Sequence, residues 1–160
     1  MKTTVTENQK NVAAAMHLST FAKYFFPFGN FIAPLLLWTF NKEKAFVDDH
    51  GKQAINFQLS VFLYALLIGM ISLPFVLIFA TDFISLIDTI NIVTLREIKS
   101  VSASIIVILI ATMLFIGLFI FELYAVISAT MAASRGKLYK YPLSISFIKT
   151  TSQPQVIETE

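Results

Sequence analysis

The stretch that decides the fold runs from Gln53 to Thr81, QAINFQLSVFLYALLIGMISLPFVLIFAT, and contains no charged residue. A second uncharged stretch runs from Ser100 to Phe121, and after Glu122 the apolar pattern continues to Ser134. The hydrocarbon core of a bilayer is about 30 Å thick, and a helix of about 20 apolar residues crosses it. The two stretches therefore predict long transmembrane helices over 53–81 and 100–134.

The composition favours lipid as the surrounding solvent. Hydrophobic residues make up 56% of the chain and charged residues 14%, with a mean hydropathy of +0.74. Soluble domains usually carry about 25% charged residues, so this chain lacks the polar side chains that would cover a soluble globule. It has no cysteine for a disulfide or a thiolate metal site, and no basic run of the kind that binds nucleic acid.

The segment before the first long stretch is apolar but interrupted. Pro27-Phe28-Gly29-Asn30 is a turn signal, and it divides this segment into the pieces 12–26 and 31–40. Each piece is too short to cross a membrane comfortably, so we expect a helical hairpin. Two arrangements remain open. The hairpin either crosses a thinned bilayer or enters and leaves on one face.

The remaining segments complete the expected organisation. Residues 1–11 predict a flexible tail, 150–160 a disordered tail, and 135–149 an interfacial segment within a single membrane domain over 12–149. The loop Asp82–Lys99 mixes apolar and charged side chains, which predicts a short amphipathic helix on the outer membrane surface. The expected fold class is an all-α integral membrane protein with four membrane-embedded helices, the short N-terminal hairpin and the two long helices.

The positive charges indicate the orientation. Lysine and arginine gather in the N-terminal tail, in the loop 41–52 and after Ser134, whereas only Arg96 and Lys99 lie between the two long stretches. Cytoplasmic loops of membrane proteins carry the excess of lysine and arginine. We therefore expect both termini in the cytoplasm and the loop Asp82–Lys99 outside.

Glu122 is the most informative polar side chain within the predicted spans. A carboxylate at this depth costs roughly 2.5–3.5 kcal/mol on insertion scales, so it should face protein or water. Counting about 1.5 Å per helical residue puts Lys23 and Tyr64 at a comparable depth. The candidate intramembrane cluster is therefore a buried Lys23–Glu122 pair joined by Tyr64. The alternative is a protonated Glu122 bonded to a neighbour, with Lys23 extending to the interface.

A second polar group lies at the expected cytoplasmic mouth of the first long helix. Asp48 or Asp49 could cap this helix. Asp49 and His50 are adjacent, but two ligands without a second set are a weak metal signal. We expect no metal, no cofactor and no catalytic residue. The candidate contact motif at this mouth consists of Asp49, His50, Lys52, Asn56 and Gln58.

Three blocks of sequence resemble a known family. They are Phe28–Leu35 (FGNFIAPL), Phe46–Gln58 (FVDDHGKQAINFQ) and Gly136–Leu143 (GKLYKYPL), and the resemblance extends roughly from Asn11 to Lys149. The family consists of small prokaryotic integral membrane proteins of unknown function. It is similar to the small Tic translocon subunit of chloroplast inner-envelope protein import. The resemblance implies a four-helix fold and a multi-pass location in the prokaryotic plasma (inner) membrane.

The expected function is that of a small membrane scaffold or accessory subunit in a larger membrane complex, linked to protein or envelope-component translocation. The alternative is a small channel or carrier with a polar intramembrane route around Glu122. No nucleophile-and-base arrangement or phosphate-cradling glycine loop suggests an enzyme. The expected partners are the lipid bilayer and either other membrane subunits or further copies of this chain, with no nucleic acid.

Overall fold

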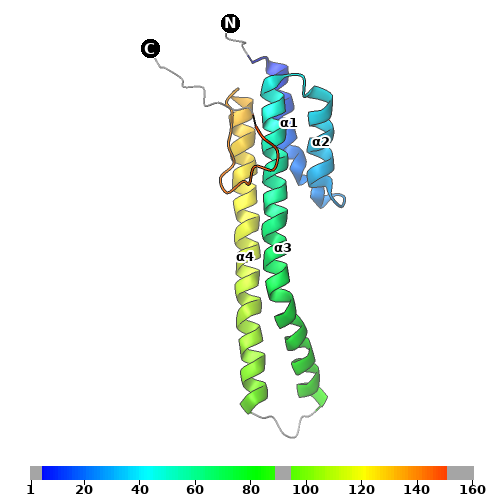
Figure 1. Ribbon diagram of the computed structural model, residues 1–160, viewed down its shortest axis with the longest axis vertical. Helices are drawn as coiled ribbons and strands as arrows, with labels where there is room; N and C mark the ends of the chain where they lie inside the picture. The colour runs from blue at the N-terminus through cyan, green and yellow to red at the C-terminus, as the bar shows by residue number, and fades with distance from the viewer. Residues whose placement is uncertain (1–4, 89–94, 151–160) are drawn as a thin grey trace, which may run out of the picture. The chain divides into compact units, whose positions relative to one another are not determined.

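The computed structural model describes the backbone of residues 5–88 and 95–150, and the side chains of residues 5–85 and 103–150. All regular elements in these parts of the chain are helices and none is a strand, which confirms the predicted all-α class and the two long helices (Figure 1). The elements in chain order are α1 (Glu7–Leu18), the 3₁₀ helix η1 (Ser19–Tyr24), α2 (Gly29–Asn41), α3 (Ala45–Asp88) and α4 (Leu95–Ser134).

The two long helices have the composition of membrane spans. The segments Ala45–Ser85 and Ala103–Ser134 are long and apolar enough to cross a membrane, and the most apolar 18-residue window of each has a mean hydropathy of 2.6 and 2.9, respectively. In their most apolar windows, only 0% and 6% of the residues are buried inside the chain. The core helix of a soluble protein would be mostly buried, so these exposed apolar faces fit a lipid environment.

Two helices begin earlier in the chain than predicted. α3 begins at Ala45 rather than at Gln53, because the charges in its first turns are paired within the protein: Lys52 Nζ lies 2.5 Å from Asp48 Oδ2. α1 begins at Glu7, inside the predicted flexible tail 1–11. Thr6 and Gln9 form a capping box there, in which each side chain bonds the backbone of the other residue.

The predicted surface helix over Asp82–Lys99 is not a separate element. Its first residues prolong α3 as far as Asp88 and its last residues belong to α4 from Leu95, while residues 89–94 lie outside the described part of the chain. An apolar helix has no reason to end at its first charged residue, since the backbone hydrogen bonds continue wherever the charge can reach water. The predicted disordered tail also lies outside the described residues beyond Thr150.

The described contacts divide the chain into two compact units. One unit comprises Met1–Val61 and Glu122–Glu160, and the other comprises Phe62–Phe121. The hydrogen bonds discussed below all lie in the first unit, which contains α1, η1, α2 and the adjoining ends of α3 and α4.

A tight turn joins η1 to α2, and α1 and α2 pack against each other (Figure 1). Phe28 has a left-handed φ of 59°, and Gly29 follows it. A Cβ at Gly29 would lie 2.4 Å from the backbone carbonyl carbon and oxygen of Ala22, so only glycine permits this close approach.

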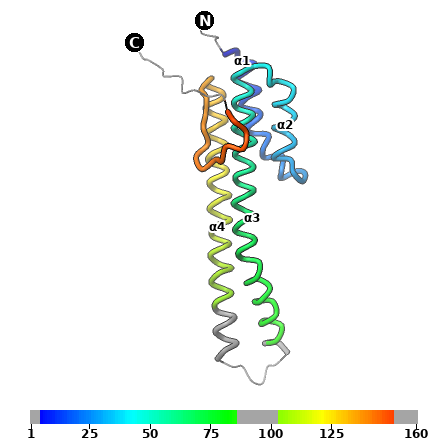
Figure 2. Tube along the Cα trace, in the orientation of Figure 1, coloured from blue at the N-terminus to red at the C-terminus, as the bar shows by residue number. Residues whose placement is uncertain are grey.

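The chain after α4 turns back on the first unit (Figure 2). Gly136, with a φ of 72°, follows the helix end, and the segment beyond it lies along α4 and across α3. The side-chain amide of Asn56 donates to the Ile148 carbonyl and accepts from the Ile148 N–H, both at 2.8 Å. Ser60 Oγ accepts from the Ile145 N–H, also at 2.8 Å. Residues 135–149, predicted as an interfacial segment, are thus fastened to α3.

Candidate functional site

A chain of polar side chains links four helical elements of the first unit. Lys23 Nζ on η1 lies 2.5 Å from Glu122 Oε2 on α4. Gln58 Nε2 on α3 donates to Glu122 Oε1 at 3.2 Å, and Asn30 Nδ2 on α2 donates to Gln58 Oε1 at 2.9 Å. The predicted Lys23–Glu122 contact is therefore present in the structure.

Each oxygen of the Glu122 carboxylate has a hydrogen-bond donor. Glu122 is 3% exposed, and an isolated charge buried to that extent would carry a large desolvation cost. Each of its two oxygens accepts from a different neighbour, Lys23 or Gln58. Gln58 can donate to Glu122 and accept from Asn30 in only one orientation of its amide, so the chain fixes that orientation. Tyr64, the third predicted member, is half-buried and belongs to the second unit.

A second buried cluster joins α1, α3 and the C-terminal segment. His17 Nε2 lies 2.8 Å from His50 Nδ1, and the Tyr141 hydroxyl lies 2.9 Å from His17 Nδ1. The Tyr141 ring stacks on Phe57 with 4.1 Å between ring centroids and 10° between the planes. Both histidines and Tyr141 are almost completely buried. This cluster packs the segment after α4 onto the helices.

One assignment of hydrogens fits both contacts between these rings. The Tyr141 hydroxyl donates to His17 Nδ1, and His17 Nε2–H donates to His50 Nδ1. His50 Nε2 then carries a hydrogen, and this buried atom has no hydrogen-bond partner among the described residues. Burial, with His50 as a second cause, lowers the pKa of His17 well below its ordinary value, so His17 is neutral near pH 7. Burial also raises the pKa of Tyr141 well above its ordinary value.

The predicted contact motif lies mostly in the interior. Lys52 is half-buried and pairs with Asp48, whose other oxygen accepts from Trp38 Nε1 at 2.9 Å. The remaining four members are buried, and the polar groups of three of them make the contacts described above. The four buried members are Asp49, His50, Asn56 and Gln58.

Sequence reasoning missed the partners supplied by the irregular C-terminal segment. Tyr141 lies in the segment 135–149 that was predicted to be interfacial, and neither it nor Ser60 was among the candidate residues. One signal was present, since Asn56 and Ser60 are four residues apart and therefore share a face of the helix. Two polar side chains on one face of an apolar helix indicate a polar partner. Among the described residues, no group of three or more histidine, aspartate or glutamate side chains could hold a metal ion.

The chain matches a known protein family. The matching family model is MamF/MmsF, described as the magnetosome magnetite crystal formation protein family, and it covers residues 8–148. This chain belongs to that family. No curated protein and no solved structure matches the chain.

This match overturns the assignment to a family similar to the small Tic translocon subunit, and translocation loses its support. The blocks that carried the resemblance have packing roles. Gly29 permits the hairpin turn, Gly51 lies against Trp38, and Gln58 bonds Glu122. Such residues specify how the helices pack, and helix packing alone does not identify a function.

Proposed function

We propose that this protein is a small accessory protein of the magnetosome membrane, an invagination of the inner membrane, and that it acts there in magnetite crystal formation. The family match over residues 8–148 is the observation that carries the proposal. The two long apolar helices support insertion into that membrane. The distribution of lysine and arginine favours cytoplasmic termini, with the segment 82–99 facing the magnetosome lumen.

Within this role, the polar side chains of the first unit act as a scaffold. Glu122 shares its two oxygens between Lys23 and Gln58, which favours a fixed internal tie over an open polar route for ions. The histidine cluster also has a packing role, because its contacts hold the C-terminal segment against the helices. We infer that the protein contributes shape and contacts to the magnetosome membrane and performs no catalysis.

The test is complementation in a magnetosome-forming bacterium from which its own MamF/MmsF proteins have been deleted. The tagged chain is expected to fractionate with magnetosome membranes and to shift the distribution of crystal sizes, measured by electron microscopy, towards that of the undeleted strain. Unchanged crystals, with the tagged chain present in the magnetosome membrane, would contradict the proposal.

A double variant, Lys23→Met with Glu122→Gln, separates the scaffold from a channel or carrier. It removes both charges while keeping side chains of similar length. A scaffold should still restore crystal size with this variant, whereas a route that needs the Glu122 charge should not. The single variant Glu122→Gln, which keeps Lys23, provides the matched comparison.

A further inference from the structure

The turn of the α1–α2 hairpin carries an unusual concentration of exposed aromatic side chains. Tyr24, Phe25 and Phe28 are 55%, 88% and 65% exposed, and Phe26 between them is also exposed. Pro27 completes the turn and is exposed as well. Apolar side chains grouped in this way on a short turn indicate a surface that contacts something other than water.

Three of the four backbone N–H groups of residues 25–29 bond within the protein. The N–H groups of Phe25 and Phe26 both bond the Ala22 carbonyl, at 3.0 and 3.1 Å, and the Gly29 N–H bonds the Phe26 carbonyl at 3.2 Å. Pro27 has no N–H to satisfy. The Phe28 carbonyl accepts from two residues of α2, at 2.9 and 3.0 Å. Backbone bonds of this kind lower the cost of placing a turn in hydrocarbon, where no water would replace them.

The polar side chains nearest the turn are directed inward. Lys23 pairs with Glu122, and Asn30 donates to Gln58. Both contacts lie within the first unit, so neither polar group needs a partner on the outer surface of the turn. What the turn presents outward is aromatic and apolar.

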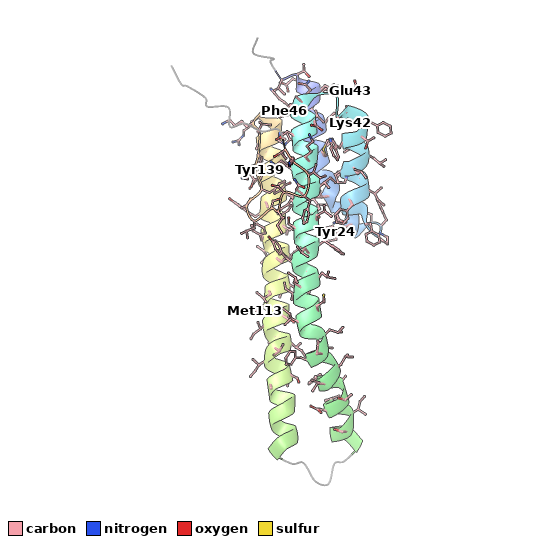
Figure 3. The ribbon with its side chains drawn as sticks, in the orientation of Figure 1. Tyr24, Lys42, Glu43, Phe46, Met113 and Tyr139 are labelled. Atoms are coloured by element: carbon pink, nitrogen blue, oxygen red, sulfur yellow. The ribbon has the colours of Figure 1, made fainter. Side chains whose placement is uncertain are left out.

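The opposite end of the hairpin is polar. α1 begins with Glu7 and Lys10, and α2 is followed by Lys42, Glu43 and Lys44. Figure 3 shows Tyr24 at the turn, and Lys42 and Glu43 at the other end of α2. The hairpin is therefore charged where it begins and ends and apolar where it turns.

We propose that the α1–α2 hairpin is a re-entrant lipid anchor, whose Tyr24–Phe28 turn lies among acyl chains while both of its ends remain on one side of the membrane. The length of α2 supports this arrangement, because its 13 residues span about 20 Å and a bilayer core is about 30 Å thick. The Lys23–Glu122 and Asn30–Gln58 contacts hold the turn against α3 and α4. This placement of the hairpin in the membrane requires no role in magnetite formation.

Site-directed spin labelling tests the proposal in the full-length protein. The chain has no cysteine, so a single Phe25→Cys or Lys42→Cys variant takes one nitroxide label. Each labelled protein is reconstituted into phosphatidylcholine–phosphatidylglycerol vesicles. Collision of the label with oxygen, which dissolves in lipid, is compared with collision with a water-soluble nickel chelate. Phe26→Cys provides a second position in the turn, and circular dichroism confirms that each variant keeps its helices.

The expected result is a loss of the nickel effect and a strong oxygen effect at positions 25 and 26, with the reverse at position 42. A strong nickel effect at position 25 would overturn the proposal, because the turn would then lie in water. This would hold whether the hairpin stayed outside the bilayer or crossed it completely. Protection from both reagents would also overturn it, since a protein surface rather than lipid would then cover the turn.

Discussion

Lys23 and Glu122 are separated by 99 positions in the sequence, and their charged groups lie 2.5 Å apart. The contact joins η1, at the end of the first hairpin arm, to α4. It is made where Glu122 is almost completely buried and Lys23 is only 25% exposed. Desolvation of the two charges offsets much of their attraction, but removing one partner leaves the other buried without compensation.

Glu122→Gln should lower the free energy of unfolding. A carboxylate offers an oxygen to Lys23 and another to Gln58, whereas an amide offers only one oxygen, so one donor loses its acceptor. Since Lys23 retains some contact with water, we expect a loss of about 1–3 kcal/mol, below that for a fully buried pair. Titration of the detergent-solubilised protein with dodecyl sulfate, followed by circular dichroism, measures the loss. An unchanged free energy of unfolding would mean that the contact contributes no stability.

Tyr141→Phe and Tyr141→Ala should separate the hydroxyl from the ring. The phenylalanine variant keeps the stack on Phe57 and loses the hydrogen bond to His17, which should cost about 1 kcal/mol. The alanine variant loses both and should cost about 3–5 kcal/mol. Limited proteolysis after α4 should speed up in the same order. Equal effects from the two variants would contradict the role of the ring stack.

Acidification should destabilise the first unit through His17. Burial, together with His50, lowers the pKa of His17 well below the ordinary value of 6.5, so the unfolded chain binds a proton before the folded one does. The free energy of unfolding should therefore be level above about pH 6.5 and fall as the pH drops below it. Tyr141, which also contacts His17, stays neutral over this range.

The matched control for this pH effect is His17→Gln. This variant should start from a lower stability and show a smaller slope between pH 4 and 6.5, with the slope that remains coming from other titratable groups. If the original chain and the variant have the same slope in dodecyl sulfate titrations, His17 does not account for the acid sensitivity.

Gly51→Ala and Gly69→Ala should act in opposite directions although both positions lie in α3. Alanine usually favours a helix over glycine by about 1 kcal/mol. At Gly51 the new Cβ would lie 2.5 Å from the Trp38 ring, which its hydrogen bond to Asp48 holds in place, so this substitution should destabilise. At Gly69 a Cβ would meet no atom within 4 Å apart from its own helix backbone and chain neighbours, so that substitution should be neutral or stabilising. Thermal unfolding in detergent compares the two, and a stabilising Gly51→Ala would contradict the packing of α2 on α3.

The sequence was informative where a regular helix repeats its spacing. Absence of charge located α3 and α4, and counting residues along helices put Lys23 and Glu122 at one depth, where the structure has them in contact. The rise per residue is constant in a helix, so depth can be counted without knowing the packing. The ends of the helices were less predictable, because charges paired within the protein, such as Asp48 and Lys52, do not stop a helix.

The contacts of the irregular segment could not be derived in this way. Tyr141 meets His17 only because the chain turns at Gly136 and runs back over α3, and no periodicity encodes that path. The bonds from Asn56 to Ile148 depend on the same return. Short motifs also did not identify the family, because the blocks quoted for the resemblance contain residues of the hairpin turn and of the helix packing.

The most direct test of the central claim, that Lys23 and Glu122 fasten the hairpin to α4, is a double-mutant cycle. Unfolding free energies are measured in detergent for the original chain, Lys23→Met, Glu122→Gln and the double variant. If Lys23 and Glu122 stabilise each other, the double variant should lose less stability than the two single variants lose together. The expected difference, the coupling energy, is about 1–2 kcal/mol. Losses that add to within about 0.5 kcal/mol would contradict the claim.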